Sequence, residues 1–524
     1  MLVLYPFGAE AGGLLRYTGG DDSPGTSDWL HGTGTDTVSP ETESSVVCVL
    51  EDDLSTPWYL EGETISFLVG CGEGVSASEV GLAAVRVPSG ARLSADGAFV
   101  WETGPADGGR HDLVFAASTS LATRTVTVWV ADNPDVDGAV AVDPEAYTEE
   151  WGLPVLHLTA PEGLGSSDEP GRVALDGDVY DVSVKVRGAS SYYYPKKSYT
   201  LDFGDDEVIF PGWDQSRDHL ILLTTFDDNS YVRQKLIYDL WAEMGEYWGE
   251  QRLVPRSSFA VVYLNGDYHG LYVVLDRIDD EFIRHMGFDD SGDLFKAVNH
   301  DANFYLTTSS GYPKSTLTEG YEKKEGEPED SYASLQALVG FTGAGSASDL
   351  VEGAGDWIEL GEFMDWLLLV HYSMSEDSAG KNSYLYQDPD TGLFRYVPWD
   401  FNHAWGQNWY TQRIPSDRLN YFEGTNRVFW AIQDVREEVL WDRFAELRDE
   451  GPLSPEALES LVDDYFARIQ PSAERDWAVW REAYRSYSGW ASARNSSDNW
   501  TEYEGEKEYL YQWLSDRATL FSDR

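Results

Sequence analysis

The chain has 524 residues, of which 42% are hydrophobic and 25% are charged. This length exceeds one ordinary hydrophobic core, so we expect two or more domains. The formal net charge of −55 argues against a nucleic-acid partner, because phosphate binding at that scale needs clustered Lys and Arg. No stretch approaches the roughly 20 apolar residues of a transmembrane segment, and no signal peptide is visible at the start.

The first third of the chain predicts three segments. Residues 1–45 are rich in Gly, Ser, Thr and Asp and predict a flexible N-terminal segment. Residues 46–132 contain short alternating runs between turns, which predict a small all-β sandwich, and residues 133–150 predict a linker. Within the sandwich, Val87–Trp101 resembles immunoglobulin-like domains of bacterial surface proteins, which implies a possible carbohydrate or protein contact through this domain.

Both cysteines of the chain, Cys48 and Cys71, fall in this predicted sandwich. A disulfide between them would fit an oxidising compartment, whereas two buried thiols would fit a reducing one. The sequence leaves both alternatives open.

A pair of segments further along predicts phosphoryl-transfer chemistry. An apolar helix, Phe363–Tyr372, leads to Asp377 and Asn382, and a predicted strand hairpin leads to Asp400, which precedes Phe401. In a protein-kinase catalytic loop, an Asp orients the substrate hydroxyl, an Asn five residues later holds metal, and a second Asp before Phe holds the metal that bridges the phosphates. Solvated loop carboxylates are the plain alternative in so acidic a chain.

A small-residue turn precedes these segments and is a candidate phosphate loop. It joins the predicted strands Tyr180–Val186 and Ser198–Phe203, and its backbone N–H groups and Ser hydroxyls can approach phosphate oxygens. A simple hairpin turn is the alternative. The cation for the phosphates is Lys196, Lys197 or Lys296, and the sequence does not rank them.

Six motifs from Val184 onward occur in the order of the spore coat protein H family, and the last two thirds of the chain, residues 151–524, resemble a CotH kinase-like protein. The motifs are Val184–Ser191, Pro195–Phe203, Asp228–Arg233, Leu264–Tyr272, Leu294–Lys296 and Pro398–Asp400. The resemblance implies an α+β, atypical protein-kinase-like domain after the immunoglobulin-like sandwich. It also implies a secreted or surface-associated enzyme, extracellular or at the cell surface, that uses ATP and Mg²⁺ or Mn²⁺ to phosphorylate Ser or Thr of a protein substrate on the cell or spore surface.

The resemblance also assigns roles to individual residues. Asp377 is the expected catalytic residue, and Asn382 and Asp400 are the expected metal ligands. The expected nucleotide-binding residues are Arg187, Ser190, Ser191, Lys196, Lys197, Asp276 and Lys296.

Two positions depart from the family pattern. Asp276 stands where many members have Glu, and Asn402 stands where a second acidic residue often follows, so Asn402 offers a metal a carbonyl oxygen without a charge. These departures leave a weakened kinase as one alternative. A catalytically silent coat-assembly binding protein on the same fold is a second. An AMP transferase is a third, because the metal-ligand set alone does not determine which phosphorus is attacked.

The sequence also predicts the structure of two further segments. The charged stretch Glu319–Asp330 predicts a mobile surface loop. Past Trp441 the chain predicts helices rich in aromatic residues, for which core packing is the first interpretation and a carbohydrate or partner surface the second. The aromatic residues in question are Trp477, Trp480, Tyr484, Trp490, Trp500, Tyr509, Tyr511 and Trp513.

Overall fold

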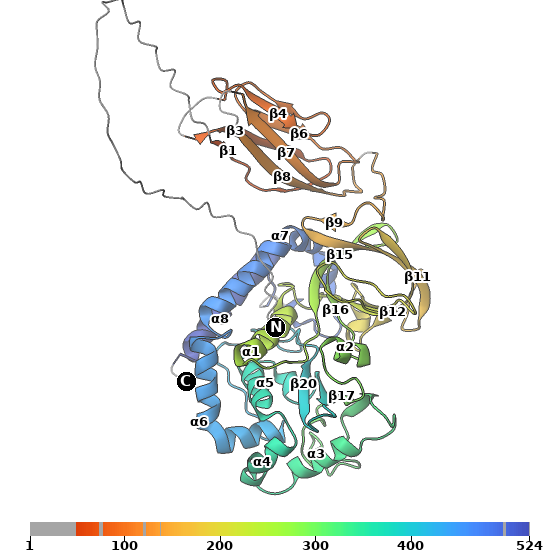
Figure 1. Ribbon diagram of the computed structural model, residues 1–524, viewed down its shortest axis with the longest axis vertical. Coiled ribbons are helices and arrows are strands. Elements are labelled where there is room, and N and C mark those ends of the chain that lie inside the picture. Colours follow the sequence, from red (N-terminus) through yellow and green to blue (C-terminus); the bar gives the residue numbers. More distant parts are fainter. Residues whose placement is uncertain (1–48, 73–76, 119–121, 137, 496–498, 523–524) are drawn as a thin grey trace, which may run out of the picture. The chain divides into compact units, whose positions relative to one another are not determined.

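The computed structural model describes residues 49–72, 77–118, 122–136, 138–495 and 499–522 (Figure 1). The predicted flexible segment, residues 1–45, lies outside these described residues, as does Cys48. Within the described ranges, no helix is both long and apolar enough to cross a membrane.

The predicted all-β region folds as two four-stranded sheets with one shared core. Phe67 and Phe99 belong to one sheet and Phe115 to the other, and the Phe115 ring lies 5.9 Å from Phe67 and 5.4 Å from Phe99 between ring centroids. Cys71 is disulfide-bonded. The immunoglobulin likeness stays a prediction. The strands are β1 (Leu50–Asp52), β2 (Trp58–Leu60), β3 (Thr64–Cys71), β4 (Leu82–Arg86), β5 (Arg92–Leu93), β6 (Ala98–Glu102), β7 (Gly109–Ala117) and β8 (Thr123–Ala131), in the sheet orders β1-β3-β6-β5 and β2-β8-β7-β4.

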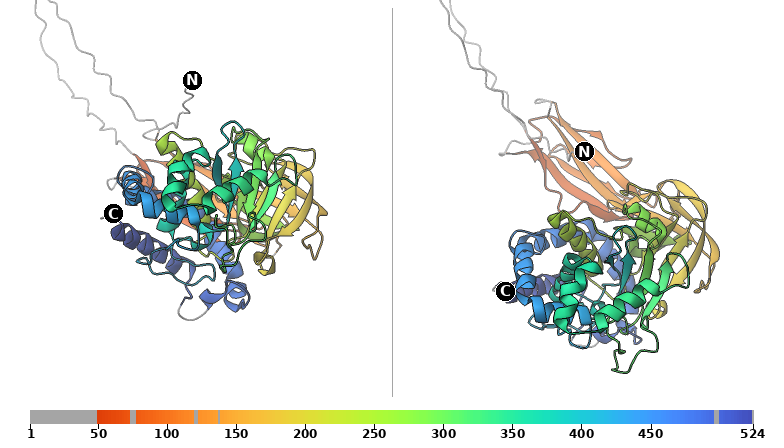
Figure 2. Two further views of the ribbon diagram at one scale, coloured as in Figure 1. Left: turned by 90° about the horizontal axis from the view of Figure 1, so that it is seen from below. Right: turned by 60° about the horizontal axis from the view of Figure 1, so that its bottom comes forward.

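The next strands form a closed barrel. Their order is β11-β12-β13-β14-β16-β15-β10-β9, and an additional pairing of β11 with β10 joins the two ends of the first seven. Figure 2 shows these strands as curved yellow and green ribbons. Alternate residues such as Val184, Leu201 and Leu222 fill the barrel interior. The strands are β9 (Glu149–Glu150), β10 (Leu153–Thr159), β11 (Glu169–Leu175), β12 (Asp178–Arg187), β13 (Ser198–Asp202), β14 (His219–Leu223), β15 (Ser257–Leu264) and β16 (Asp267–Leu275).

A further four-stranded sheet and eight α-helices follow in the part of the chain that the structure describes. The predicted strand hairpin is confirmed as β19 (Ser383–Gln387) and β20 (Phe394–Pro398), which lie in the order β18-β17-β19-β20 with β17 (Asp293–Ala297) and β18 (Tyr321–Glu325). This composition confirms the mixed α and β class, and the likeness to a protein kinase stays a prediction. The helices are α1 (Arg233–Trp248), α2 (Asp280–His285), α3 (Ala333–Gly343), α4 (Ala347–Gly353), α5 (Leu360–Ser373), α6 (Arg427–Asp449), α7 (Pro455–Ser486) and α8 (Tyr503–Leu520).

The predicted apolar helix is α5, and it positions the hairpin that leads to Asp400. Trp366 on α5 stacks on Tyr396 of β20, with ring centroids 4.4 Å apart and planes 11° apart. Both side chains are buried, so the end of β20 has a fixed place relative to the helix.

The charged stretch Glu319–Asp330 is not wholly a loop, because β18 forms within it. Tyr321 is buried, and Lys323 forms an ion pair with Asp293 of β17 at 2.7 Å. The sequence did not predict this short edge strand, because four of its five residues are charged, although its residues alternate between more and less accessible positions.

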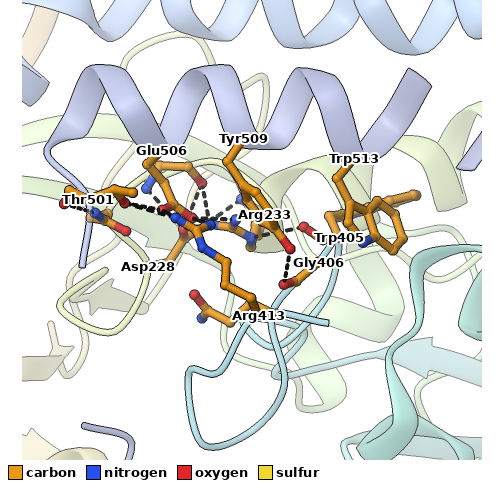
Figure 3. A network of polar contacts seen from close by, with 12 residues as sticks. Asp228, Arg233, Trp405, Gly406, Arg413, Thr501, Glu506, Tyr509 and Trp513 are labelled. Carbon is orange, nitrogen blue, oxygen red and sulfur yellow. Dashed lines mark hydrogen bonds and ion pairs between the residues drawn. The ribbon is translucent and has the colours of Figure 1, made fainter. Parts of the chain in front are cut away.

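A buried ion-pair network joins α8 to α1 and to the loop that follows Asp400 (Figure 3). Arg233 donates to Asp228 and to Glu506, both at 2.5 Å, and Arg413 donates to the other Glu506 oxygen at 2.7 Å. Burial alone would raise the pKa of Glu506, but the charges of Arg233 and Arg413 outweigh it and lower the pKa to about 2. The ion pair of Arg413 with Glu506 therefore holds the loop to α8, and Arg233 holds the same carboxylate to α1.

Tyr509 and Trp513 of α8 add neutral contacts to the same loop. The Tyr509 hydroxyl donates to the Gly406 carbonyl at 2.8 Å (Figure 3). The Trp513 indole N–H donates to the Ile414 carbonyl, also at 2.8 Å.

We expect Glu506→Gln to destabilise the protein by about 3 kcal/mol at pH 7, because a carboxylate with a lowered pKa stabilises the folded state above its unfolded pKa. That contribution is fully present above about pH 5 and falls by more than half near pH 3, as Glu506 approaches protonation in the folded state. Denaturant unfolding of both proteins from pH 7 to pH 3 measures it, with the exposed Glu508→Gln as control. A stability difference that does not shrink on acidification would contradict the ion-pair account.

Candidate active site

A cavity of about 460 Å³ lies between the outer face of the barrel and the sheet that contains β17. Its barrel side comes from β12, β13 and β14, and its other side from β17, β18, β19 and the residue after β20. The lining residues are Asp168, Lys185, Arg187, Thr200, Asp202, His219, Ile221, Arg277, Ile278, Lys296, Lys324, Glu325, Tyr384 and Trp399.

Strand alternation and register explain the barrel side of the cavity. Val184 and Val186 point into the barrel, so Lys185 and Arg187 of the same strand point outward. The pairing places Lys185 opposite Thr200, and Thr200 opposite Ile221, which makes one row across three strands.

The cavity concentrates positive charge in a strongly acidic protein. Five basic and three acidic side chains line it, although the chain has 37 Lys and Arg against 92 Asp and Glu. Isoleucine and aromatic side chains line it as well. This is a lining that suits an anion with an apolar or aromatic part.

Of these cations, Arg187 and Lys296 form no ion pair with a described residue, whereas Lys185, Arg277 and Lys324 each do. The Arg187 guanidinium lies 4.9 Å from the Trp399 ring, and its Nη1 atom is buried without a hydrogen-bond partner. Among the described residues, Lys296 has no hydrogen-bond or ion-pair partner, and its ammonium lies 5.5 Å from the same ring. Burial lowers the pKa of both groups. Half-buried cations of this kind favour an anionic ligand.

The structure brings the two expected metal ligands together. Asn382 and Asp400 both adopt left-handed backbone conformations, with φ of 57° and 58°, which Asn and Asp tolerate better than most residues. The Asn382 amide donates to the Asp400 carbonyl at 3.0 Å, so its side-chain oxygen remains for another partner. These positions follow from the loop before β19 and from the end of β20.

The Asp400 carboxyl faces groups of both charges. Asp400 is an exposed residue, although protein groups surround its carboxyl. Burial and the charge of Asp227 raise its pKa, while His403, Lys296 and Arg187 act in the opposite direction. Asp400 is therefore within electrostatic reach of the two cavity cations.

Asp227 is a neighbour that the sequence analysis missed. It is 4% exposed, accepts hydrogen bonds from the Tyr194 hydroxyl at 3.0 Å and from Asn402, and lies 3.3 Å from His403 Nε2. Burial would raise its pKa, but His403 and Arg494 outweigh that effect and lower it. Asn402 Oδ1 is buried without a hydrogen-bond partner.

Asp377 lies in the one-turn helix Glu376–Ala379 after α5, between two basic groups. His300 Nε2 is 3.3 Å from one carboxylate oxygen, and Lys381 Nζ is 3.1 Å from the other. Burial would raise the pKa of Asp377, yet these two groups outweigh it and lower the pKa. The carboxylate is thus ionised and is suited to accept a hydrogen bond from a substrate hydroxyl.

Comparison with known proteins places this geometry in a family. The chain matches the CotH kinase protein family over residues 184–521, which is more than half of its length. The chain belongs to this family. It is also 27% identical over 293 residues to the inner spore coat protein H of Bacillus subtilis (strain 168), a match that covers 56% of this chain and 77% of that protein. The matched region contains the Lys and Arg residues that line the cavity. It also contains Asp227, Asp377, Asn382 and Asp400.

Other expected nucleotide-binding residues of the CotH region have partners within the chain. Lys196 is 1% exposed and donates to Asp476 at 2.5 Å and to the Leu271 carbonyl at 2.6 Å, and Lys197 donates to the Tyr192 carbonyl at 2.7 Å. Asp276 accepts from Arg217 at 2.6 Å and pairs with no Lys in the described residues. None of these three lines the cavity.

Ser190 and Ser191 follow Gly188 in the turn after β12. Gly188 has φ of 106°, and a Cβ atom there would lie 2.0 Å from Ser191 Oγ, so the turn requires glycine. Ser190 is exposed and Ser191 half-buried, and both lie within four residues of Arg187.

The described residues also contain one group that could hold a cation, Asp218, His219 and Asp279, whose ligand atoms lie within 4.8 Å of one another. His219 lines the cavity, but its Nε2 is 2.6 Å from an Arg277 nitrogen. A guanidinium in that position competes with a cation, so this group is the weaker candidate.

We expect Lys196→Met to destabilise the protein by about 3–5 kcal/mol, because it leaves the Asp476 carboxylate buried without its cation. Denaturant unfolding measures this, and Lys197→Met is the control, since the Lys197 ammonium has no carboxylate partner in the described ranges and contacts the Tyr192 carbonyl group and ring. If Lys196→Met instead kept its stability and lost nucleotide affinity, a phosphate-binding role for Lys196 would be favoured.

Proposed function

We propose that this CotH family member is a metal-dependent phosphotransferase that transfers the γ-phosphate of ATP to Ser or Thr hydroxyls of a partner protein. The observation that carries the proposal is the pair of half-buried cations, Arg187 and Lys296, in a cavity beside Asp400. The family match supports it. The spore coat relative supports a location on a cell or spore surface.

The residues present fit ATP and a divalent metal. Arg187 and Lys296 would bind the phosphate oxygens, and the Trp399 ring, over which both cations lie, lines the same cavity. Asp400 and the side-chain oxygen of Asn382 would hold Mg²⁺ or Mn²⁺, and the unpartnered oxygen of Asn402 is a further hard donor nearby. The metal, when bound, neutralises charge on the phosphates.

Asp377 would orient the acceptor hydroxyl and accept its hydrogen bond. Lys381, paired with Asp377, is placed to offset negative charge near the acceptor, and His300 fixes the other carboxylate oxygen. The spacing to Asn382 and the family resemblance predict this role for Asp377, and these two neighbours add a physical reason for its ionised state.

We expect label from γ-labelled ATP to reach the protein or a generic acceptor with Mg²⁺ or Mn²⁺, and Asp400→Ala to abolish this transfer. Asp390→Ala, in the exposed turn between β19 and β20, is the matched control and should retain activity. Label from α-labelled ATP alone would change the assignment to AMP transfer. No label from either, together with no metal-dependent ATP binding by calorimetry, would favour a catalytically silent coat-assembly protein.

A second prediction concerns the cavity cations alone. Arg187→Gln and Lys296→Met should each weaken Mg-ATP binding about tenfold or more, because each removes a charge-assisted contact to phosphate. Arg172→Gln, which removes an exposed cation of β11 paired with Asp181, should leave the affinity unchanged. Calorimetric titration measures all three, and equal losses in the control would contradict a specific site.

A further inference from the structure

Three aromatic side chains from two distant loops form an exposed stack, here called the aromatic platform: Trp409, Tyr410 and Trp490. Their exposed fractions are 39%, 36% and 46%. The rings of Trp409 and Trp490 are stacked, with centroids 4.7 Å and planes 25° apart, and Tyr410 lies 5.3 Å from Trp409 and 6.3 Å from Trp490. Core packing, the first expectation for Trp490, therefore does not describe this residue.

Buried polar contacts hold the platform in place. Thr411 donates to the Ala491 carbonyl at 3.1 Å, and the Ala493 N–H donates to the Tyr410 carbonyl at 3.2 Å. Arg494, 1% exposed, bonds the Thr411 hydroxyl through its main chain, at 3.3 Å, and the main chain of Asp227 through its guanidinium. The exposed rings thus stand on a fixed frame, so little conformational entropy is lost when a ligand binds them.

The same frame connects the platform to the candidate active site. Gln407, two residues before Trp409, donates to the Asp227 carbonyl at 2.9 Å. Two residues of chain span at most about 7 Å, so the platform lies beside the loop that carries Asp400 and Asn402.

The chemistry of the platform is neutral and polar. The segments Trp405–Gln412 and Tyr487–Ala493 contain no charged residue, in a chain of which 25% is charged. The indole N–H groups of Trp409 and Trp490 donate no hydrogen bond to a described residue, and Gln412 and Ser488 are exposed beside them. A ligand here meets flat rings, free N–H donors and amide or hydroxyl groups.

This combination selects among partner classes. A basic peptide would be expected to meet carboxylates, and the two segments offer none; a polyanion is repelled by a chain of net charge −55. A sugar ring has an apolar C–H face that packs on an aromatic ring and hydroxyl groups that accept from N–H donors and bond amides.

We propose that the aromatic platform is a binding site for neutral carbohydrate chains. It is separate from phosphoryl transfer and holds the protein on a glycan-bearing surface or partner, next to the Asp400 loop. The binding needs neither ATP nor metal, so its failure and the failure of the proposed kinase activity are distinguishable.

The test is isothermal titration of the full chain with cellohexaose, chitohexaose and maltohexaose, without nucleotide. We expect saturable binding of at least one of them, weakened about tenfold or more in both Trp409→Ala and Trp490→Ala. Tyr312→Ala, which removes an aromatic side chain that is 72% exposed elsewhere, should bind as the wild type does. Gln412→Ala, which keeps the ring stack, should also weaken binding.

Thermal unfolding of each variant separates loss of binding from loss of folding. No binding of any of the three oligosaccharides, or binding that is unchanged in folded Trp409→Ala and Trp490→Ala, would overturn the proposal. Titration with a proline-rich decapeptide is the competing arm: Trp490-dependent binding of the peptide without oligosaccharide binding would reassign the platform to peptide recognition.

Discussion

The arrangement of the functional loops depends on the ion pairs that the Glu506 carboxylate forms. This carboxylate is fully buried, and it is shared by Arg233 at the start of α1 and Arg413 in the loop after Asp400. A single carboxylate with two guanidinium partners in a dry environment is strongly held. Through these ion pairs, α8 fixes the position of the loop that contains Arg413. This loop lies almost a hundred residues earlier in the sequence.

The protein uses its few cations in two distinct ways. Arg233, Lys196 and Arg217 are buried and paired with carboxylates, so they bind elements of the fold to one another. Arg187 and Lys296 lie in the cavity without carboxylate partners among the described residues. A cation without a carboxylate partner keeps its charge available to an anionic ligand, so the distinction separates structural cations from the ones available to a ligand.

Asp227 connects the two surfaces proposed to bind ligands. Its carboxylate bonds Tyr194 and Asn402 on the side of Asp400, and its carbonyl accepts from Gln407 and Arg494, which hold the aromatic platform. A carbohydrate-bound partner would therefore be positioned near the loop that contains Asp400 and Asn402. The two sites nevertheless use different chemistry: charge and oxygen ligands in one, neutral rings and amides in the other.

The sequence by itself determined the local features: the apolar helix α5, the hairpin of β19 and β20, and the spacing of Asp377, Asn382 and Asp400. These features depend on periodicity and turn residues within a few positions, which a single sequence displays. Only the tertiary structure decided which Lys faces the cavity, because the partner of Lys196 is Asp476, far along the chain. Closure of the barrel by β10 and β11, the place of Asp227 and the exposure of Trp490 were likewise decided by long-range packing, since such contacts leave no periodic signal in the sequence.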